Sequence, residues 1–305
     1  MQTFHSHGKL LITGEYVVLD GATALALPTK YGQTLKVELA DKPGISWTSI
    51  DHEGKTWFEK TFSKAELTSS EAIDQEVGKI EKRLLSVLRI AIIANPDMLS
   101  KEEGYKVTTE TDFPLDWGLG TSSTLIANVA KWFNIDAYKL LEKTFGGSGY
   151  DVAVAMQDHP ITYELSGEHR SVLATSFNPT FKDKIFFVYL NQKQNSRESI
   201  AHYKKQDKQT LLKAVEKISS ITHQVITCTD ISEFNLLLEI HENVISQLIN
   251  LPKIKTQLFQ DYQGTVKSLG GWGGDFVMAT GGEKEKEYFR SKGYDTIIPY
   301  SEMIL

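Results

Sequence analysis

The stretch Gly118-Leu119-Gly120-Thr121-Ser122-Ser123-Thr124 decides how this sequence is interpreted. Polar and apolar residues alternate before it at 105–109, and an apolar segment with helical spacing follows it at 123–133. This order predicts a turn that leads from a strand into a helix. Glycines let such a turn approach a ligand closely, and the first turn of the helix offers unpaired N–H groups to an anion. An ordinary turn with Thr121 or Ser122 as the helix cap explains the same residues, so this stretch alone leaves both interpretations open.

Three other segments combine glycine with charged or hydroxyl residues. They are Gly8-Lys9 with Gly14-Glu15, Gly147-Ser148-Gly149-Tyr150-Asp151, and Gly270-Gly271-Trp272-Gly273-Gly274-Asp275. Considered singly, Lys9 is typical of an exposed lysine and Asp151 of a carboxylate at the start of a helix. The glycines of the last segment are costly in backbone entropy, which favours a loop that approaches a ligand or a neighbouring backbone. Together the segments have the composition expected of a phosphate site assembled from distant parts of the chain.

The familiar single motifs of nucleotide-binding proteins do not occur in the sequence. There is no Gly-x4-Gly-Lys-Ser/Thr, so the chain is not a P-loop protein. The protein-kinase signatures fail as well, because His169-Arg170 is followed by serine and Asp275-Phe276 by valine.

Composition excludes several other classes of protein. The 305 residues are 41% hydrophobic and carry a net charge of −6, which suits one large domain or two packed lobes. The basic residues are scattered, which argues against a nucleic-acid-binding surface. No apolar run approaches a membrane span and residues 1–10 lack a signal region, so we expect a cytoplasmic protein without membrane contact. A single cysteine, Cys228, and the absence of a zinc-binding histidine pattern give no support to thiol or zinc chemistry.

Hydrophobic periodicity predicts an α+β chain. Strands are expected at 9–12, 16–19, 35–39, 105–109, 185–190 and 276–279, and helices at 123–133, 138–145, 210–227 and 234–251. Asp136 and Asp230 stand where a helix cap is needed. A turn-rich stretch at 166–181 separates two halves of the chain, and we therefore expect domains at 1–170 and 171–305.

The order and content of these segments resemble the GHMP kinases, the superfamily of galactokinase, homoserine kinase, mevalonate kinase and phosphomevalonate kinase. Residues 8–21 (GKLLITGEYVVLDG) resemble its first motif, residues 114–124 (PLDWGLGTSST) its second and residues 270–276 (GGWGGDF) its third. The resemblance extends over nearly the whole chain, and the three motifs occur in the family's order. It implies a two-lobed fold. An N-terminal lobe similar to ribosomal protein S5 domain 2 would carry the phosphate loop, and a ferredoxin-like C-terminal lobe would carry the third motif.

The resemblance also implies MgATP as the phosphoryl donor. Lys9 would neutralise charge between donor and acceptor. Asp151 would be a general base for a hydroxyl acceptor, or would orient Lys9 if the acceptor is an ionised phosphate. ATP would be bound by Gly118, Leu119, Gly120, Thr121, Ser122, Ser123 and Thr124, with Ser122, Ser123 and Glu142 as candidate Mg²⁺ ligands. The acceptor would contact Ser148, Gly149, Gln194, Ser196, Gly273, Gly274 and Asp275.

Three segments, residues 8–16, 147–153 and 273–275, are most similar to phosphomevalonate kinases, so 5-phosphomevalonate is the favoured acceptor. The alternatives are a mevalonate kinase, another hydroxyl-directed kinase (homoserine, sugar) or a diphosphomevalonate decarboxylase. Whichever acceptor is used, we expect a monomer or a homodimer. The sequence departs from the family pattern at His7, Thr121, Thr124 and Trp272. Trp272 replaces a usual glycine, where it could crowd the phosphate cleft or supply a stacking face. It favours a further alternative, a non-catalytic relative that binds nucleotide.

Overall fold

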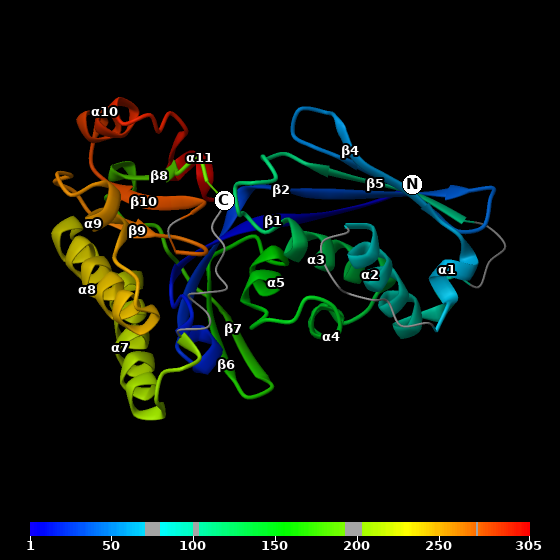
Figure 1. Cartoon of the computed structure of the whole chain (residues 1–305), viewed down its shortest axis with the longest axis horizontal. Helices are drawn as coiled ribbons and strands as arrows, with labels where there is room; N and C mark the ends of the chain where they lie inside the picture. Colours follow the sequence, from blue (N-terminus) through cyan, green and yellow to red (C-terminus); the bar gives the residue numbers. More distant parts are fainter. Residues whose placement is uncertain (71–79, 100–103, 193–202, 273) are drawn as a thin grey trace. The chain divides into compact units, whose positions relative to one another are not determined.

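The computed structural model describes residues 1–70, 80–99, 104–192, 203–272 and 274–305 (Figure 1). The strands are β1 Gln2–Thr13, β2 Ala24–Ala40, β3 Ile45–Ile50, β4 Thr56–Phe62, β5 Gly104–Thr111, β6 Ile161–Ser166, β7 His169–Ala174, β8 Ile185–Tyr189, β9 Val266–Ser268, β10 Phe276–Thr280 and β11 Ile297–Pro299. The helices are α1 Lys64–Thr68, α2 Ile80–Ala94, α3 Thr121–Phe133, α4 Ala137–Glu142, α5 Tyr150–Ala155, α7 Lys208–Thr227, α8 Ile231–Ile249, α9 Ile254–Leu258, α10 Glu283–Ser291 and α11 Tyr300–Met303. This mixture confirms the expected α+β class. No helix in the described part of the chain combines the length and hydropathy that crossing a membrane requires.

The chain forms two compact units, and both are discontinuous in sequence. Unit 1 consists of Met1–Gly8, Tyr31–Leu115 and Gly120–Met156, and unit 2 of Lys9–Lys30, Asp116–Leu119 and Gln157–Leu305. The chain passes from one unit to the other within β1 and β2 and again beside Gly120. The expected domain boundary near residue 170 stays a prediction.

Unit 1 is a sheet covered by helices. β3 pairs with β4 in antiparallel and with β5 in parallel orientation, and the second half of β2 pairs with β5 from Gln33↔Thr111 to Ala40↔Gly104. Figure 1 shows α2, α3 and α4 together on one side of β2 and β5. Apolar residues alternate on the strands and repeat at helical spacing on the helices, as a half-buried sheet under amphipathic helices requires. The core includes Leu35, Val37, Trp47, Val107, Leu88, Ile126 and Phe133.

Unit 2 is built around a second sheet of order β11-β8-β10-β9, with antiparallel pairs throughout. All five residues of β8 are buried, which explains its uninterrupted apolar sequence. α8 packs against β9 and α7 packs against α8 (Figure 1). The first residues of β2 pair separately with β6, and β6 forms a hairpin with β7. The β9–β10 hairpin carries the third glycine segment between its strands.

Most expected elements are confirmed, but the strand expected at 16–19 is wrong. Residues Val17–Asp20 form a 3-10 helix, because the backbone has positive φ at Gly14 (98°) and Tyr16 (64°) before it and at Gly21 (93°) after it. These angles turn the chain back on itself, which an extended strand cannot do. The helix starts at Asp136 and Asp230 are confirmed, since both carboxylates accept backbone N–H groups of the first turn.

Candidate active site

Lys9 and the Gly118 turn lie side by side in unit 2, although 109 residues separate them in sequence. The backbone N–H of Lys9 donates to the carbonyl oxygen of Leu119 at 2.9 Å, and the Lys9 Nζ donates to the carbonyl oxygen of Gly118 at 3.1 Å. Lys9 is therefore held at the turn by two bonds, one from its backbone N–H and one from its ammonium group. The first and second motifs meet at this point.

The third motif meets the same turn through the carboxylate of Asp275. A Cβ atom built on Gly118 would lie 2.4 Å from Asp275 Cγ, and one built on Gly270 would lie 2.9 Å from Asp275 Oδ2. Both glycines also have positive φ, 66° and 67°. Asp275 is fixed in turn by its backbone, which donates to Gln192 O and accepts from the Leu190 N–H, both at 2.8 Å. Glycine is thus needed at both positions because the Asp275 carboxylate occupies the space of a side chain.

Trp117 anchors the Gly118 turn, a contact that the sequence analysis missed. Its ring stands edge-on to Phe276 at a centroid distance of 5.3 Å and lies 6.3 Å from Tyr189. Both partners belong to strands of the unit 2 sheet. Edge-to-face aromatic pairs of this kind add about 0.5–1.5 kcal/mol beyond the area that they bury. In the sequence, the only sign of this contact is that a large aromatic residue, Trp117, stands directly before Gly118.

Trp272 is a packing residue. Its side chain is 2% exposed, its backbone has φ of 59°, and its indole N–H donates to Pro252 O at 3.2 Å. A ring buried in this way offers no face to a ligand, so the stacking role is wrong. The left-handed backbone explains why glycine would also suit this position.

In unit 1, α3 begins without a side-chain cap. Gly120 is the N-cap residue, with φ of 97°, so the capping roles considered for Thr121 and Ser122 are wrong. Ser123 Oγ donates to the Gly120 carbonyl at 2.8 Å, and Thr124 Oγ1 donates to the same oxygen at 3.2 Å. The first turn of this 13-residue helix thus has N–H groups that no hydroxyl caps. Such a turn attracts an anion.

The candidate Mg²⁺ ligands fit unequally. The Ser122 hydroxyl is exposed in the first turn of α3 and fits an ion that arrives with nucleotide phosphates. Ser123 does not fit, because its hydroxyl is buried and donates to Gly120. Glu142 is exposed at the end of α4, and no group of three or more His, Cys, Asp or Glu side chains in the described ranges could hold a metal. The role of Glu142 stays a prediction.

Asp151 lies in the first turn of α5 in unit 1, and its Oδ1 accepts the N–H of Val152 at 3.0 Å. Gly149 is the N-cap residue with φ of 87°, and Ser148 is buried beside it. α5 packs against α3 within this unit. Because Lys9 belongs to unit 2, a joint role of Lys9 and Asp151 stays a prediction.

Three of the expected acceptor residues cannot be placed. Gln194, Ser196 and Gly273 lie outside the described residues. Gly274 is buried beside Asp275 at the start of β10.

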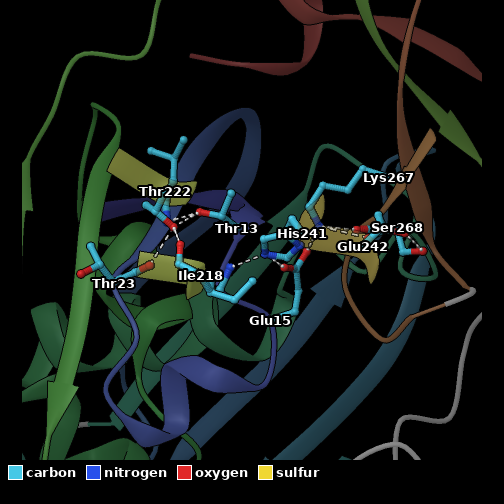
Figure 2. Close-up of polar contacts among 11 residues, drawn as sticks. Thr13, Glu15, Thr23, Ile218, Thr222, His241, Glu242, Lys267 and Ser268 are labelled. Atoms are coloured by element: carbon cyan, nitrogen blue, oxygen red, sulfur yellow. Dashed lines mark hydrogen bonds and ion pairs between the residues drawn. The ribbon is translucent and has the colours of Figure 1, made fainter. Parts of the chain in front are cut away.

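A buried network of charged residues beside the first motif was missed entirely (Figure 2). Lys267 on β9 pairs with Glu15, and its Nζ lies 3.6 Å from Glu242 Oε1 on α8. His241 Nε2 accepts the Gly14 N–H at 3.0 Å and lies 3.3 Å from Glu15 Oε2. These four side chains are at most 3% exposed. Nothing in the short strand Val266-Lys267-Ser268 marks the lysine as buried, and its partners Glu15 and Glu242 are distant in sequence.

Burial shifts the pKa values of this network. It raises the pKa of Glu242 to about 7, against the opposing effect of Lys267. It also raises the pKa of Glu15 and lowers the pKa of His241 well below its ordinary value. The imidazole is therefore neutral, which agrees with Nε2 acting as an acceptor.

No protein-family model and no curated protein matches the sequence. Solved structures do match. A mevalonate kinase has a TM-score of 0.72 at 17% identity, covering 98% of this chain and 98% of that one. Streptococcus pneumoniae phosphomevalonate kinase in complex with phosphomevalonate and AMPPNP has a TM-score of 0.71 at 15% identity, covering 98% and 100%. Lactococcus lactis galactokinase complexed with galactose has a TM-score of 0.70 at 12% identity, covering 100% and 93%. These three proteins are GHMP kinases, and the likeness over the whole length shows that this chain has the GHMP kinase fold.

Proposed function

We propose that the chain is an ATP-dependent small-molecule phosphotransferase. The observation that carries the proposal is the meeting of three distant segments, with Lys9 Nζ 3.1 Å from the Gly118 carbonyl and the Asp275 carboxylate against Gly118. A turn that needs glycine and holds an ammonium group, and that leads into an uncapped helix, suits polyphosphate. The fold supports the same class of reaction, because its neighbours in the structural comparison are kinases.

In this proposal MgATP is a substrate and the chain supplies position and charge. The N–H groups of the first turn of α3 would hold the β- and γ-phosphates, with the exposed Ser122 hydroxyl close to the magnesium ion that accompanies them. Lys9 would offset the negative charge between donor and acceptor. Phosphoryl transfer depends mainly on such positioning and electrostatic stabilisation.

The favoured acceptor is 5-phosphomevalonate. Two arguments support it. Residues 147–153 and 273–275 resemble phosphomevalonate kinases, and the match to the S. pneumoniae phosphomevalonate kinase structure covers 98% of this chain and 100% of that one. An acceptor phosphate is already ionised near neutral pH, so Asp151 would then orient Lys9 rather than remove a proton. With a hydroxyl acceptor such as mevalonate, Asp151 would be the general base.

A coupled ADP-release assay tests the proposal with mevalonate, 5-phosphomevalonate, homoserine and galactose. We expect the highest kcat/KM with 5-phosphomevalonate. A preference for another member of the panel would replace the acceptor and keep the reaction class, and CO₂ release from diphosphomevalonate would indicate a decarboxylase. ATP binding without turnover of any acceptor would reject the enzyme and favour a nucleotide-binding protein.

A further inference from the structure

The buried network around Lys267 has no part in the proposed reaction, although it contacts the first motif and leads into the third. We propose that Lys267 and His241 are positioning residues: they fix the Gly14–Glu15 turn, and through β1 they fix the Lys9 side chain at the Gly118 turn. This inference rests on the proposed function, because it concerns where Lys9 is held for phosphoryl transfer. All the residues that it uses belong to unit 2.

The first step is that the network is a poor device for stability alone. Glu15, Lys267 and Glu242 are 3%, 0% and 1% exposed, so three ionisable groups have been taken out of water. Apolar residues of similar volume are often as stabilising as a buried ion pair, or more so. A requirement on geometry explains the network better than a requirement on stability does.

The second step is that residues of the network bind the Gly14–Glu15 turn, which directly follows β1. The N–H of Gly14 donates to His241 Nε2 on α8, and Lys267 on β9 pairs with Glu15, the next residue. A Cβ atom at Gly14 would lie 2.6 Å from Ala24 Cβ, so the turn has no room to shift towards β2. The turn is thereby held from two elements at once (Figure 2).

Polar contacts hold the last residue of β1 as well. Thr13 Oγ1 lies 2.8 Å from Thr222 Oγ1 on α7 and accepts the Leu25 N–H at 3.1 Å. Lys9 stands on the same strand, where its N–H donates to Leu119 O. Because a paired strand is stiff, fixing its end fixes the direction from which Lys9 reaches Gly118.

The third step links the network to Asp275. Lys267 and Ser268 are the last residues of β9, and Ser268 Oγ donates to Glu242 Oε2 at 3.2 Å. The following residue, Leu269, donates its N–H to Phe276 O at 3.1 Å and so closes the hairpin loop that contains Asp275. Lys267, which pairs with Glu15 in the turn after β1, therefore stands at the base of the loop whose carboxylate lies against Gly118.

Charge balance suggests which variants are informative. With His241 neutral, Lys267 is the cation that faces two carboxyls, Glu15 and Glu242. Replacing Lys267 alone leaves both carboxyls buried without it, and the variant Lys267→Met is expected to unfold easily. Replacing Lys267 with Met and Glu15 with Gln together removes the ion pair and leaves Glu242 as the remaining acidic group of the network. Below about pH 7 burial keeps Glu242 protonated, so no buried charge is left behind there.

The test compares this double variant, Lys267→Met with Glu15→Gln, with a matched control pair. The control is Lys253→Met with Glu239→Gln, which removes an ion pair of 2.5 Å in the same unit between two residues that are not members of the network. We expect the double variant to melt close to the wild type and to lose on the order of a hundredfold in kcat, the cost of a misplacement of about 1 Å. The loss should appear in kcat rather than in the KM for ATP. If the double variant has both the stability and the kcat of the wild type, the network is not needed to position Lys9 and the proposal is overturned.

A second readout does not depend on activity. Amide hydrogen exchange should show lost protection at Gly14 and Lys9 in the double variant and retained protection in the control pair. Unchanged protection at both amides in the double variant would overturn the positioning role, whatever the turnover. If the wild type phosphorylates none of the acceptors, the proposed function fails, and the exchange measurement still decides whether the network holds the turn.

Discussion

Lys9 Nζ donates a hydrogen bond of 3.1 Å to the carbonyl oxygen of Gly118, and this contact joins the first glycine segment to the second. The lysine is only partly buried, so its charge can act on a bound anion while its position is set by the turn. The carbonyl oxygen that accepts this bond carries no formal negative charge. The arrangement is therefore suited to a residue that must remain cationic beside phosphate.

The first prediction concerns this charge. Lys9→Met should reduce turnover by well over a hundredfold while ATP binding largely survives, because a lost charge-assisted interaction in the transition state affects kcat most. Steady-state kinetics and ATP titration measure the two effects. Lys30→Met is the matched control, since Lys30 Nζ also donates to a backbone carbonyl in unit 2, that of Ser301 at 2.8 Å. Near-normal turnover of the Lys9 variant would remove Lys9 from the mechanism.

The second prediction separates a capping role of Asp151 from a chemical one. In Asp151→Asn the amide oxygen can still accept the Val152 N–H that Asp151 now accepts at 3.0 Å, so the melting temperature should change little. Turnover should nevertheless fall by well over a hundredfold, because the negative charge is lost. Asp136→Asn, at the start of α4, provides the control for a carboxylate that only caps a helix. A variant with normal turnover would leave Asp151 as a capping residue.

Local sequence signals predicted much of this fold. The alternation of Leu35 and Val37 and the carboxylates Asp136 and Asp230 each depend on neighbours within a few residues, and the structure agrees with all of them. The strand expected at 16–19 was wrong because positive φ at Tyr16 is not visible in an apolar sequence. Apolar periodicity cannot separate a short strand from a 3-10 turn.

The site was less predictable, because its contacts cross long stretches of sequence. The motifs pointed to Lys9, Gly118 and Asp275 separately, but their meeting depends on contacts of the Gly118 turn with β1 on the one hand and with Asp275 before β10 on the other. Lys267 was missed because its partner Glu15 is 252 residues away in sequence. Hydrophobic periodicity does not reveal a pair of residues so far apart, and the three-residue strand Val266–Ser268 gives no local sign that its lysine is buried.

The third prediction concerns Trp272. Trp272→Gly should destabilise the protein by about 3–5 kcal/mol, because it empties a buried site. The KM for ATP should stay unchanged in the folded fraction, since the ring does not present a face to ligand. Trp272→Phe keeps an aromatic ring and loses only the N–H that Pro252 O accepts at 3.2 Å, so it should be intermediate in stability. An increase in the KM for ATP in both variants would restore a stacking role.

The fourth prediction concerns the fit of Asp275 against Gly118. Gly118→Ala places a Cβ atom 2.4 Å from the carboxylate at a φ of 66°, so it should be destabilising and should lower turnover. The positive φ alone costs about 1–2 kcal/mol. Gly293→Ala measures that cost separately, because Gly293 has a φ of 86° and nothing within 4 Å of its added Cβ. Adding Asp275→Ala should recover part of the excess of the Gly118 variant over this control, because it removes the carboxylate at 2.4 Å and leaves the Asp275 Cβ at 2.9 Å. Additive effects in the double-mutant cycle would contradict the contact.

The last prediction is a pH dependence that originates in Glu242. Burial raises its pKa to about 7 in the folded protein, from 4.5 in the unfolded chain. Between these values the folded state binds more protons than the unfolded state, so the contribution of Glu242 to stability is full below about pH 4.5 and is lost as the pH rises to about 7. Glu242→Gln resembles the protonated form at every pH and can still accept from Ser268.

Denaturant unfolding of both proteins checks this prediction. Glu242→Gln and the wild type should be of similar stability at about pH 5, and the variant should be more stable by about 3 kcal/mol at about pH 8. The buried His241 destabilises both proteins equally as the pH falls below its ordinary pKa, so its effect cancels in the difference. A difference that does not change with pH would mean that Glu242 stays ionised in the folded protein. The charge balance inferred for the Lys267 network would then be wrong, because both carboxylates would face one ammonium group.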